Sequence, residues 1–156
     1  MKNYLIDTFR FNDATNKKLL TKINLLANKT ECVRLFSHLI NCQYKWMARL
    51  LGDPKADEMS WWDPVYTFDE LEQEWTRSVE PWIAYLTART EEDLSTELKF
   101  IGFDGAQYAV SLQDIALQLN YHSFHHRGQI QTLIRQQGLI PDTLDYIRTK
   151  SRKLSE

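Results

Sequence analysis

Residues 111–137 read SLQDIALQLNYHSFHHRGQIQTLIRQQ, and this stretch decides the predicted fold. Its inward-facing side chains recur at the three- and four-residue spacing of an α-helix. Ser111, followed by Asp114, provides an N-terminal cap, and Gly138 provides a stop. The sequence therefore predicts one long helix whose inward face consists of Leu112, Ile115, Leu119, His122, His126, Ile130 and Leu133.

Two stretches nearer the N-terminus show the same spacing, at about residues 2–27 and about residues 30–51. The second ends before Gly52 and Pro54, which is typical of a helix stop. It carries apolar side chains on two faces, which predicts a helix that is buried on two sides. We therefore expect this helix to lie at the centre of a bundle or to face a second subunit.

A third helix is predicted to begin near Thr67, which has the capping-box spacing to Glu70. Its apolar positions are again at helical spacing. Pro81 interrupts the pattern, and proline cannot donate the backbone hydrogen bond of a helix interior. We therefore expect a kink or an early end at this position.

The remaining segments predict a hairpin and a short final helix. The stretch 98–110 contains two β-rich runs around Asp104-Gly105, which is a strong short-range signal for a β-hairpin. Residues 142–150 predict a short C-terminal helix. Four long helices with modest connections indicate an all-α fold, a four-helix bundle, formed by a single domain over residues 1–156.

The composition argues against several functional classes. The 19 basic and 21 acidic residues give a net charge of −2, without the basic stripe of a nucleic-acid-binding protein. No apolar run approaches the ~20 residues of a membrane span, and the N-terminus lacks the apolar block of a signal peptide. Cys32 and Cys42 are too few for a disulfide scaffold. We expect a cytoplasmic protein that binds neither nucleic acid nor a membrane.

Three of the four histidines fall on inward faces of predicted helices. His122 and His126 are one turn apart, so their imidazoles point to the same place and can clamp a divalent ion. His38 lies in the middle of the second predicted helix and supplies a third ligand if the two helices are neighbours. The spacing alone equally allows hydrogen-bonded core histidines without a metal. His125 lies about 100° from His126 around the helix, so we expect it at the surface or the rim.

The segment 120–130, NYHSFHHRGQI, resembles the HxxxHRGQ signature of the DinB/YfiT-like family. These are small metal-binding bundle proteins, unrelated to the lesion-bypass polymerase of the same name. Residues 35–40 (LFSHLI), Trp46 and the LLG at 50–52 resemble the second helix of that family, with its single metal-binding histidine. The first predicted helix and the C-terminal tail also fit, so the resemblance covers essentially the whole chain.

The resemblance implies an up-down-down-up bundle, often a homodimer, that holds one divalent metal ion. Carried over residue by residue, the ligands are His38, His122 and His126. Histidine-rich sites accept several divalent ions, of which we expect zinc or nickel. Some relatives transfer low-molecular-weight thiols and others resemble hydrolases, which implies a metal-dependent enzyme acting on a small molecule. The alternative is a non-enzymatic, stress-linked metal-binding or interaction protein.

Three neutral imidazoles leave at least one coordination position open, which is the pattern of catalytic zinc sites. Such a metal activates a bound water or a bound thiolate. Ser123 stands where HExxH metalloproteases carry a glutamate, which argues against proteolysis of that type. No carboxylate stands out as a general base, and for Asp104 a turn-forming role is the better interpretation.

Several other residues have two interpretations each. Cys42, one turn from His38, either completes the metal site as a fourth ligand or is a small buried hydrophobe. Asn12 and Asn16 either line the pocket and orient a ligand histidine or form hydrogen bonds between helices. Arg127 either attracts an anionic substrate or forms a structural ion pair. The five tryptophans are expected mostly in the core and loops, with one or two at a pocket rim.

Overall fold

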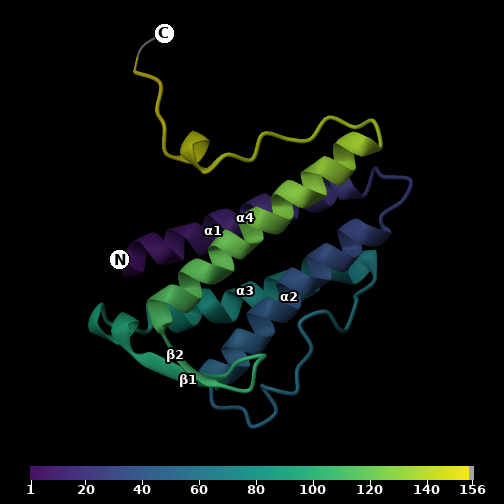
Figure 1. Cartoon of the computed structure of the whole chain (residues 1–156). Helices are drawn as coiled ribbons and strands as arrows, with labels where there is room; N and C mark the ends of the chain where they lie inside the picture. Colours follow the sequence, from purple (N-terminus) through teal and green to yellow (C-terminus); the bar gives the residue numbers. More distant parts are fainter. Residues whose placement is uncertain (155–156) are drawn as a thin grey trace.

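The computed structural model describes residues 1–154. Its body consists of four helices, α1 (Lys2–Ile23), α2 (Thr30–Leu50), α3 (Leu71–Thr87) and α4 (Leu112–Gln136) (Figure 1). Helices α1 and α2 each pack against both α3 and α4, so that α2 and α4 are neighbours. None of the helices within the described chain is long and apolar enough to cross a membrane.

Helix α4 forms as its sequence predicts. The Ser111 hydroxyl accepts a hydrogen bond from the backbone N–H of Asp114 at 3.2 Å, which caps the first turn. Gly138 follows the last turn with a φ of +82°, a conformation that favours glycine. The capping box of Thr67 and Glu70 is also present, ahead of α3.

The core lies between the four helices and is built around large aromatic side chains. Phe9 of α1 stacks on Trp82 of α3 with ring centroids 5.7 Å apart, and Phe36 of α2 meets Trp75 of α3 edge-on at 5.5 Å. Helix α2 is buried along most of its length, with neighbours in α3, α4 and the first strand. Both of its apolar faces are therefore covered within the chain, which supports the central position.

A β-hairpin connects α3 to α4. Strand β1 (Glu97–Ile101) pairs antiparallel with β2 (Gln107–Ser111), and Gly105 takes a φ of +79° in the connecting turn. The hairpin packs on the C-terminal half of α2, where Phe100 meets Trp46 edge-on at 5.2 Å. Phe103, at the tip, remains 94% exposed.

The connection between α2 and α3 is tied to the surface of α2. The backbone N–H of Tyr66 donates to the Ser37 hydroxyl, and the Asn41 amide donates to the carbonyl of Pro64. The Lys45 ammonium is buried and donates to two backbone carbonyls of the same connection, those of residues 57 and 59. This connection consequently lies along α2 rather than projecting into solvent.

Two local expectations are corrected by the structure. The early end expected at Pro81, one of the two outcomes predicted there, does not occur: α3 continues to Thr87, because Val79 and Trp82 on either side are buried in the core and packing outweighs the missing hydrogen bond. The segment predicted as a C-terminal helix forms only a short 3-10 turn, Tyr146–Thr149. Its side chains are mostly exposed, and so short a segment without a buried face does not sustain a helix.

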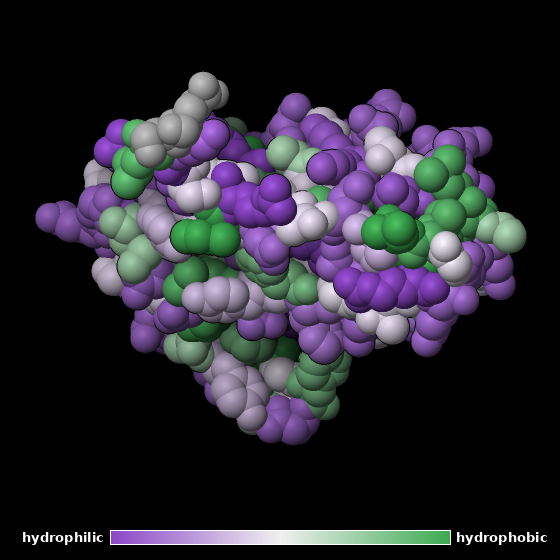
Figure 2. Space-filling view, turned by 90° about the horizontal axis from the view of Figure 1, so that it is seen from above, coloured by the Kyte–Doolittle hydropathy of each residue, from purple (hydrophilic) through white to green (hydrophobic). Residues whose placement is uncertain are grey.

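The C-terminal segment lies across α1 and α4, where Tyr146 meets Phe11 edge-on at 5.1 Å. Figure 2 looks onto this face and shows a mostly hydrophilic surface on which hydrophobic side chains gather in small groups. The site described next lies on a different side of α4, toward α2.

Candidate metal centre

The three histidines of the predicted site meet between α2 and α4. The ring centroids of His38 and His122 are 5.0 Å apart, those of His38 and His126 are 4.9 Å apart, and those of His122 and His126 are 4.5 Å apart. His38 and His126 are buried, and His122 is half-buried. The prediction that His38 faces the other two from a neighbouring helix is thus met by the structure.

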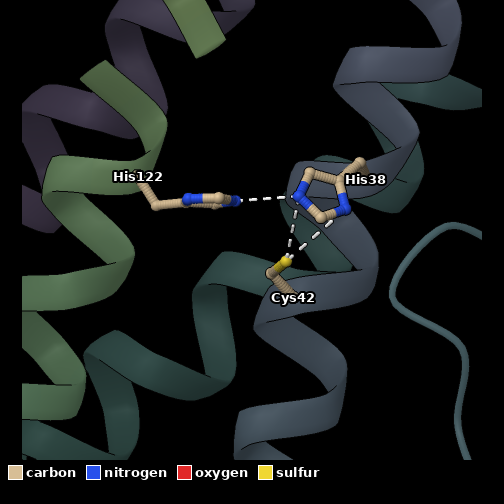
Figure 3. A group of neighbouring side chains, drawn as sticks. All are labelled: His38, Cys42 and His122. Atoms are coloured by element: carbon tan, nitrogen blue, oxygen red, sulfur yellow. Dashed lines mark hydrogen bonds between the residues drawn. The ribbon is translucent and has the colours of Figure 1, made fainter. Parts of the chain in front are cut away.

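Nitrogen and sulfur atoms approach one another at the centre of this group. The Nε2 atoms of His38 and His122 are 2.8 Å apart. The Cys42 sulfur is 3.7 Å from Nε2 of His38 and 3.8 Å from Nδ1 of the same ring. Figure 3 shows the sulfur directed toward the two imidazoles from one turn further along α2. The ligand atoms of His38, Cys42 and His122 all lie within 4.8 Å of one another, close enough to hold a metal ion.

Hydrogen bonds outside the cluster orient two of the imidazoles. Nδ1 of His38 lies 2.6 Å from the backbone carbonyl oxygen of Trp61, and Nδ1 of His126 lies 2.7 Å from the side-chain oxygen of Gln129. Both oxygens only accept, so each Nδ1 carries the hydrogen and each Nε2 of the neutral ring keeps its lone pair. Metal-binding histidines in proteins are held in this way.

Stacking adds a second constraint on His38. The Trp62 indole lies parallel to the imidazole, with centroids 3.8 Å apart and an interplanar angle of 12°. The Arg34 guanidinium lies over the same indole at 4.4 Å. Two consecutive residues of the α2–α3 connection therefore hold one ring, the first through its carbonyl and the second through its side chain.

Burial keeps the cluster uncharged. It lowers the pKa of His126 to about 4, and together with the neighbouring His126 and His38 it lowers the pKa of His122 to about 4. Burial also lowers the pKa of His38 and raises that of the Cys42 thiol to about 12. Neutral imidazoles are the form that binds a metal, so no proton has to leave the histidines near neutral pH. The ligand atoms of His38, Cys42 and His122 fit a divalent metal ion, whereas the nitrogens of His126 lie outside this closely spaced group, although its ring packs beside theirs.

A cleft of about 470 Å³ opens onto the cluster. His38, Cys42 and His122 contribute to its wall, whereas His126 does not. The remaining wall is largely apolar and aromatic and comprises Trp46, Trp61, Trp62, Phe103, Gln118 and Leu119. No carboxylate belongs to this wall in the part of the chain that the structure describes. A bound molecule would meet aromatic surface on one side and the histidine and cysteine side chains on the other.

The other candidate residues divide between the rim and the core. His125 is exposed, as predicted for a rim position. The side-chain oxygens of Asn12 and Asn16 accept hydrogen bonds from the Arg127 guanidinium at 2.8 and 3.1 Å. These bonds join α1 to α4, which confirms that the two asparagines form hydrogen bonds between helices. Arg127 is 2% exposed, so it is not placed to attract a substrate, and its partners are amides rather than the carboxylate of an ion pair.

Asp104 has the turn-forming role. Its carboxylate accepts from the backbone N–H of Ala106 and from the Tyr108 hydroxyl, and these bonds lower its pKa. Two tryptophans, Trp75 and Trp82, are fully buried in the core. The other three border the cleft, one more than the sequence suggested.

The sequence did not predict two features of the site. The Trp61 carbonyl holds His38, and Phe103 borders the cleft from the hairpin tip. The only sequence signal was the pair of adjacent tryptophans in a proline-containing connection, which indicates a packed rather than a free loop. A backbone carbonyl carries no signal of its own.

Comparison with known proteins agrees with this arrangement. A sequence model described as the DinB family matches residues 13–154, a range that includes both histidine-bearing helices. No curated protein and no solved structure matches the chain. Because the match covers nearly the whole chain together with the histidine cluster between α2 and α4, the protein belongs to the DinB family.

Proposed function

We propose that the protein binds one divalent metal ion through the Nε2 atoms of His38, His122 and His126. The observation that carries this proposal is the engagement of Nδ1 in His38 and in His126 by oxygens outside the group, so that the Nε2 side of each ring faces the other imidazoles within a group of three adjacent rings.

The imidazole nitrogens of His38 and His122 lie slightly closer together than two nitrogens bound to the same zinc ion would. Tetrahedral zinc holds imidazole nitrogens at 2.0–2.1 Å, which places two such nitrogens roughly 3.3 Å apart. The Nε2 atoms of His38 and His122 are 2.8 Å apart, so the rings need to separate by only ~0.5 Å. Zinc and nickel both suit neutral imidazole ligands, and we propose one of these.

We infer further that the protein is an enzyme acting on a small molecule, with a low-molecular-weight thiol as the favoured substrate. When bound, a divalent ion lowers the pKa of a coordinated thiol or water. Among residues 1–154, none of those that line the cleft is a carboxylate that could serve as a general base for water, whereas a coordinated thiolate is already the nucleophile. The aromatic residues of the wall would position the electrophile against it. This supports thiol transfer over hydrolysis.

The resemblance also implies features that remain proposals. The up-down-down-up order is a proposal that rests on the resemblance, alongside the observed packing of α1 and α2 against both α3 and α4. The homodimer is a proposal that rests on the resemblance, and light scattering of the purified protein measures it directly.

Metal content per chain tests the site. Protein purified without an affinity tag and incubated with zinc or nickel should retain close to one ion, and His122→Ala and His126→Ala should retain almost none. His125→Ala is the matched control, because this exposed histidine lies on the same turn and should leave the content unchanged. Wild-type protein without metal after such incubation would overturn the proposal.

Activity separates the enzyme from a non-enzymatic metal-binding protein. The metal-loaded protein should accelerate transfer of a small thiol to an aryl halide, with the thiolate sulfur bonding to the ring carbon and the halide leaving. His122→Ala should abolish the acceleration. A protein that holds its ion fully but accelerates neither thiol transfer nor ester hydrolysis would support the non-enzymatic alternative.

A further inference from the structure

We infer that Cys42 is a fourth ligand of the metal, so that the resting centre is closed by three histidines and one thiolate. This inference rests on the metal binding proposed above. Three histidines leave the fourth coordination position of a tetrahedral ion open. The group that occupies this position, water or a side chain, is the one that an incoming substrate has to displace.

The sulfur is already at a suitable distance. Zinc–sulfur bonds of about 2.3 Å and zinc–nitrogen bonds of about 2.0–2.1 Å place a tetrahedral sulfur and nitrogen roughly 3.5 Å apart. The Cys42 sulfur lies 3.7 Å from Nε2 of His38. It is nearly as close to Nδ1, so it lies beside the ring, and ligation requires the cysteine or the imidazole to turn about one side-chain bond.

The helix fixes Cys42 where a ligand is needed. Cys42 follows His38 by four residues on α2, and such pairs share one face of a helix. Its sulfur also forms part of the cleft wall, beside His38 and His122. Cys32, on the same helix, is equally buried but belongs neither to this group nor to the wall. The chain thus provides its own matched control.

A ligating Cys42 changes how a substrate enters. Four protein ligands fill a tetrahedral ion, so a substrate thiol must displace one of them. The exchange balances without an oxidant: the metal–sulfur bond to Cys42 breaks, the bond to the substrate sulfur forms, and the substrate's proton passes to the Cys42 sulfur. Cysteine is the ligand whose replacement by another thiolate leaves the ligand set chemically unchanged.

Cobalt substitution tests the ligand directly. Cobalt(II) in a tetrahedral site absorbs in the visible range whatever its ligands, and a thiolate ligand adds a charge-transfer band in the near ultraviolet. Wild-type and Cys32→Ser proteins should show both features. Cys42→Ser should keep the visible bands and lose the near-ultraviolet band, and its cobalt affinity should fall at least ~10-fold, the lower end of the cost of removing even an indirect partner of a metal site.

The outcomes are distinguishable. Visible bands without the near-ultraviolet band in the wild type, or a band that persists in Cys42→Ser, would overturn the role of Cys42 and leave the three-histidine site standing. Absence of all cobalt bands would overturn the proposed function and this inference together. Circular dichroism shows whether Cys42→Ser is folded, and Cys42→Ala provides a second variant without a hydroxyl.

An added thiol tests the exchange. 2-Mercaptoethanol titrated into cobalt-loaded Cys42→Ser protein should restore the near-ultraviolet band, because the fourth position is then open. The wild type should show the band before any thiol is added and keep it throughout the titration, because Cys42 already supplies a thiolate and an exchanged thiol supplies another. A wild-type band that grows with added thiol, as in Cys42→Ser, would contradict ligation by Cys42.

Discussion

Helix α4 contributes to two buried polar clusters that use the interior differently. The amide–arginine cluster, toward α1, consists of Asn12, Asn16, Asn120, Ser123 and Arg127. The histidine cluster, toward α2, consists of His38, Cys42, His122 and His126. Adjacent residues of α4, His126 and Arg127, belong to different clusters because successive side chains are about 100° apart around a helix.

The two clusters differ in how their polar atoms are satisfied. In the amide–arginine cluster, Arg127 donates to Asn12 and Asn16, whose amides donate onward to Asn120 and Ser123. Each link joins a donor to an acceptor within the chain. In the histidine cluster, the Nε2 atoms of His38 and His122 face each other at 2.8 Å and the ring of His126 lies beside them. The first arrangement is a chain of matched amide and guanidinium hydrogen bonds, whereas the second gathers imidazole nitrogens that can also bind a cation, and this difference separates structural polar groups from the proposed binding site.

The largest expected effect is the stabilisation of the histidine cluster by its ion. When free zinc exceeds the dissociation constant about 1,000-fold, the free energy of unfolding should rise by about 4 kcal/mol. Urea denaturation with and without zinc measures this. His126→Ala should show no rise, and His125→Ala should show the full one. Equal stabilisation of wild type and His126→Ala would place the zinc elsewhere.

Replacing a residue of the amide–arginine cluster should lower stability and leave metal binding intact. Arg127→Ala leaves two buried amide oxygens without a donor and should lower the free energy of unfolding by about 3 kcal/mol. The folded variant should still bind one metal ion per chain. Arg135→Ala, an exposed arginine of the same helix, should change stability by less than ~0.5 kcal/mol. A variant that lost its metal but kept its stability would break the comparison.

Between about pH 6.5 and pH 4, acid should destabilise the metal-free protein through the histidine cluster. His122 and His126 have pKa values of about 4 when folded, against about 6.5 when unfolded. Between these values the unfolded chain binds more protons, so stability rises with pH from about 4 to about 6.5 and is fully present above that. The loss should reach about 2 kcal/mol, a value reduced for solvent screening because the His122 ring is half-buried. Urea midpoints across this pH range should be flatter for a variant with both histidines replaced by alanine.

The smallest effect tests the outer hydrogen bond of His126. Gln129→Ala removes the acceptor of the Nδ1 hydrogen and should weaken zinc binding about 10-fold, or about 1.4 kcal/mol. Gln129→Glu keeps an acceptor and should bind zinc at least as tightly as the wild type. Competition with a chromophoric chelator measures both. Unchanged affinity in Gln129→Ala would mean that this bond does not orient the ring.

The sequence was most informative where one periodic pattern determines the structure. Spacing and caps predicted α4 and the shared direction of His122 and His126. The position of His38 opposite them came from its place on α2 together with the family resemblance, because packing between distant helices has no local signature. Pro81 shows the limit of a local rule, since the early end that it allowed does not occur where the side chains around it are buried.

The remaining parts of the site depend on segments without periodicity. The Trp61 carbonyl reaches His38 only because the connection is anchored to α2 by several scattered hydrogen bonds. Whether Asn12 and Asn16 contact a histidine depends on the rotation of α4 about its axis. In the structure this rotation directs Arg127, and not a histidine, toward α1. Such relations are fixed by the tertiary structure and not by any single stretch of sequence.

The stack of Trp62 on His38 gives the protein a built-in optical reporter. The indole lies 3.8 Å from a ring that would bind the ion, and it is 39% exposed, unlike the buried Trp75 and Trp82. An open-shell ion such as nickel or cobalt at His38 would quench its emission at this range, whereas closed-shell zinc would leave it bright. A fall in intrinsic fluorescence would then distinguish an open-shell ion from closed-shell zinc, without any label.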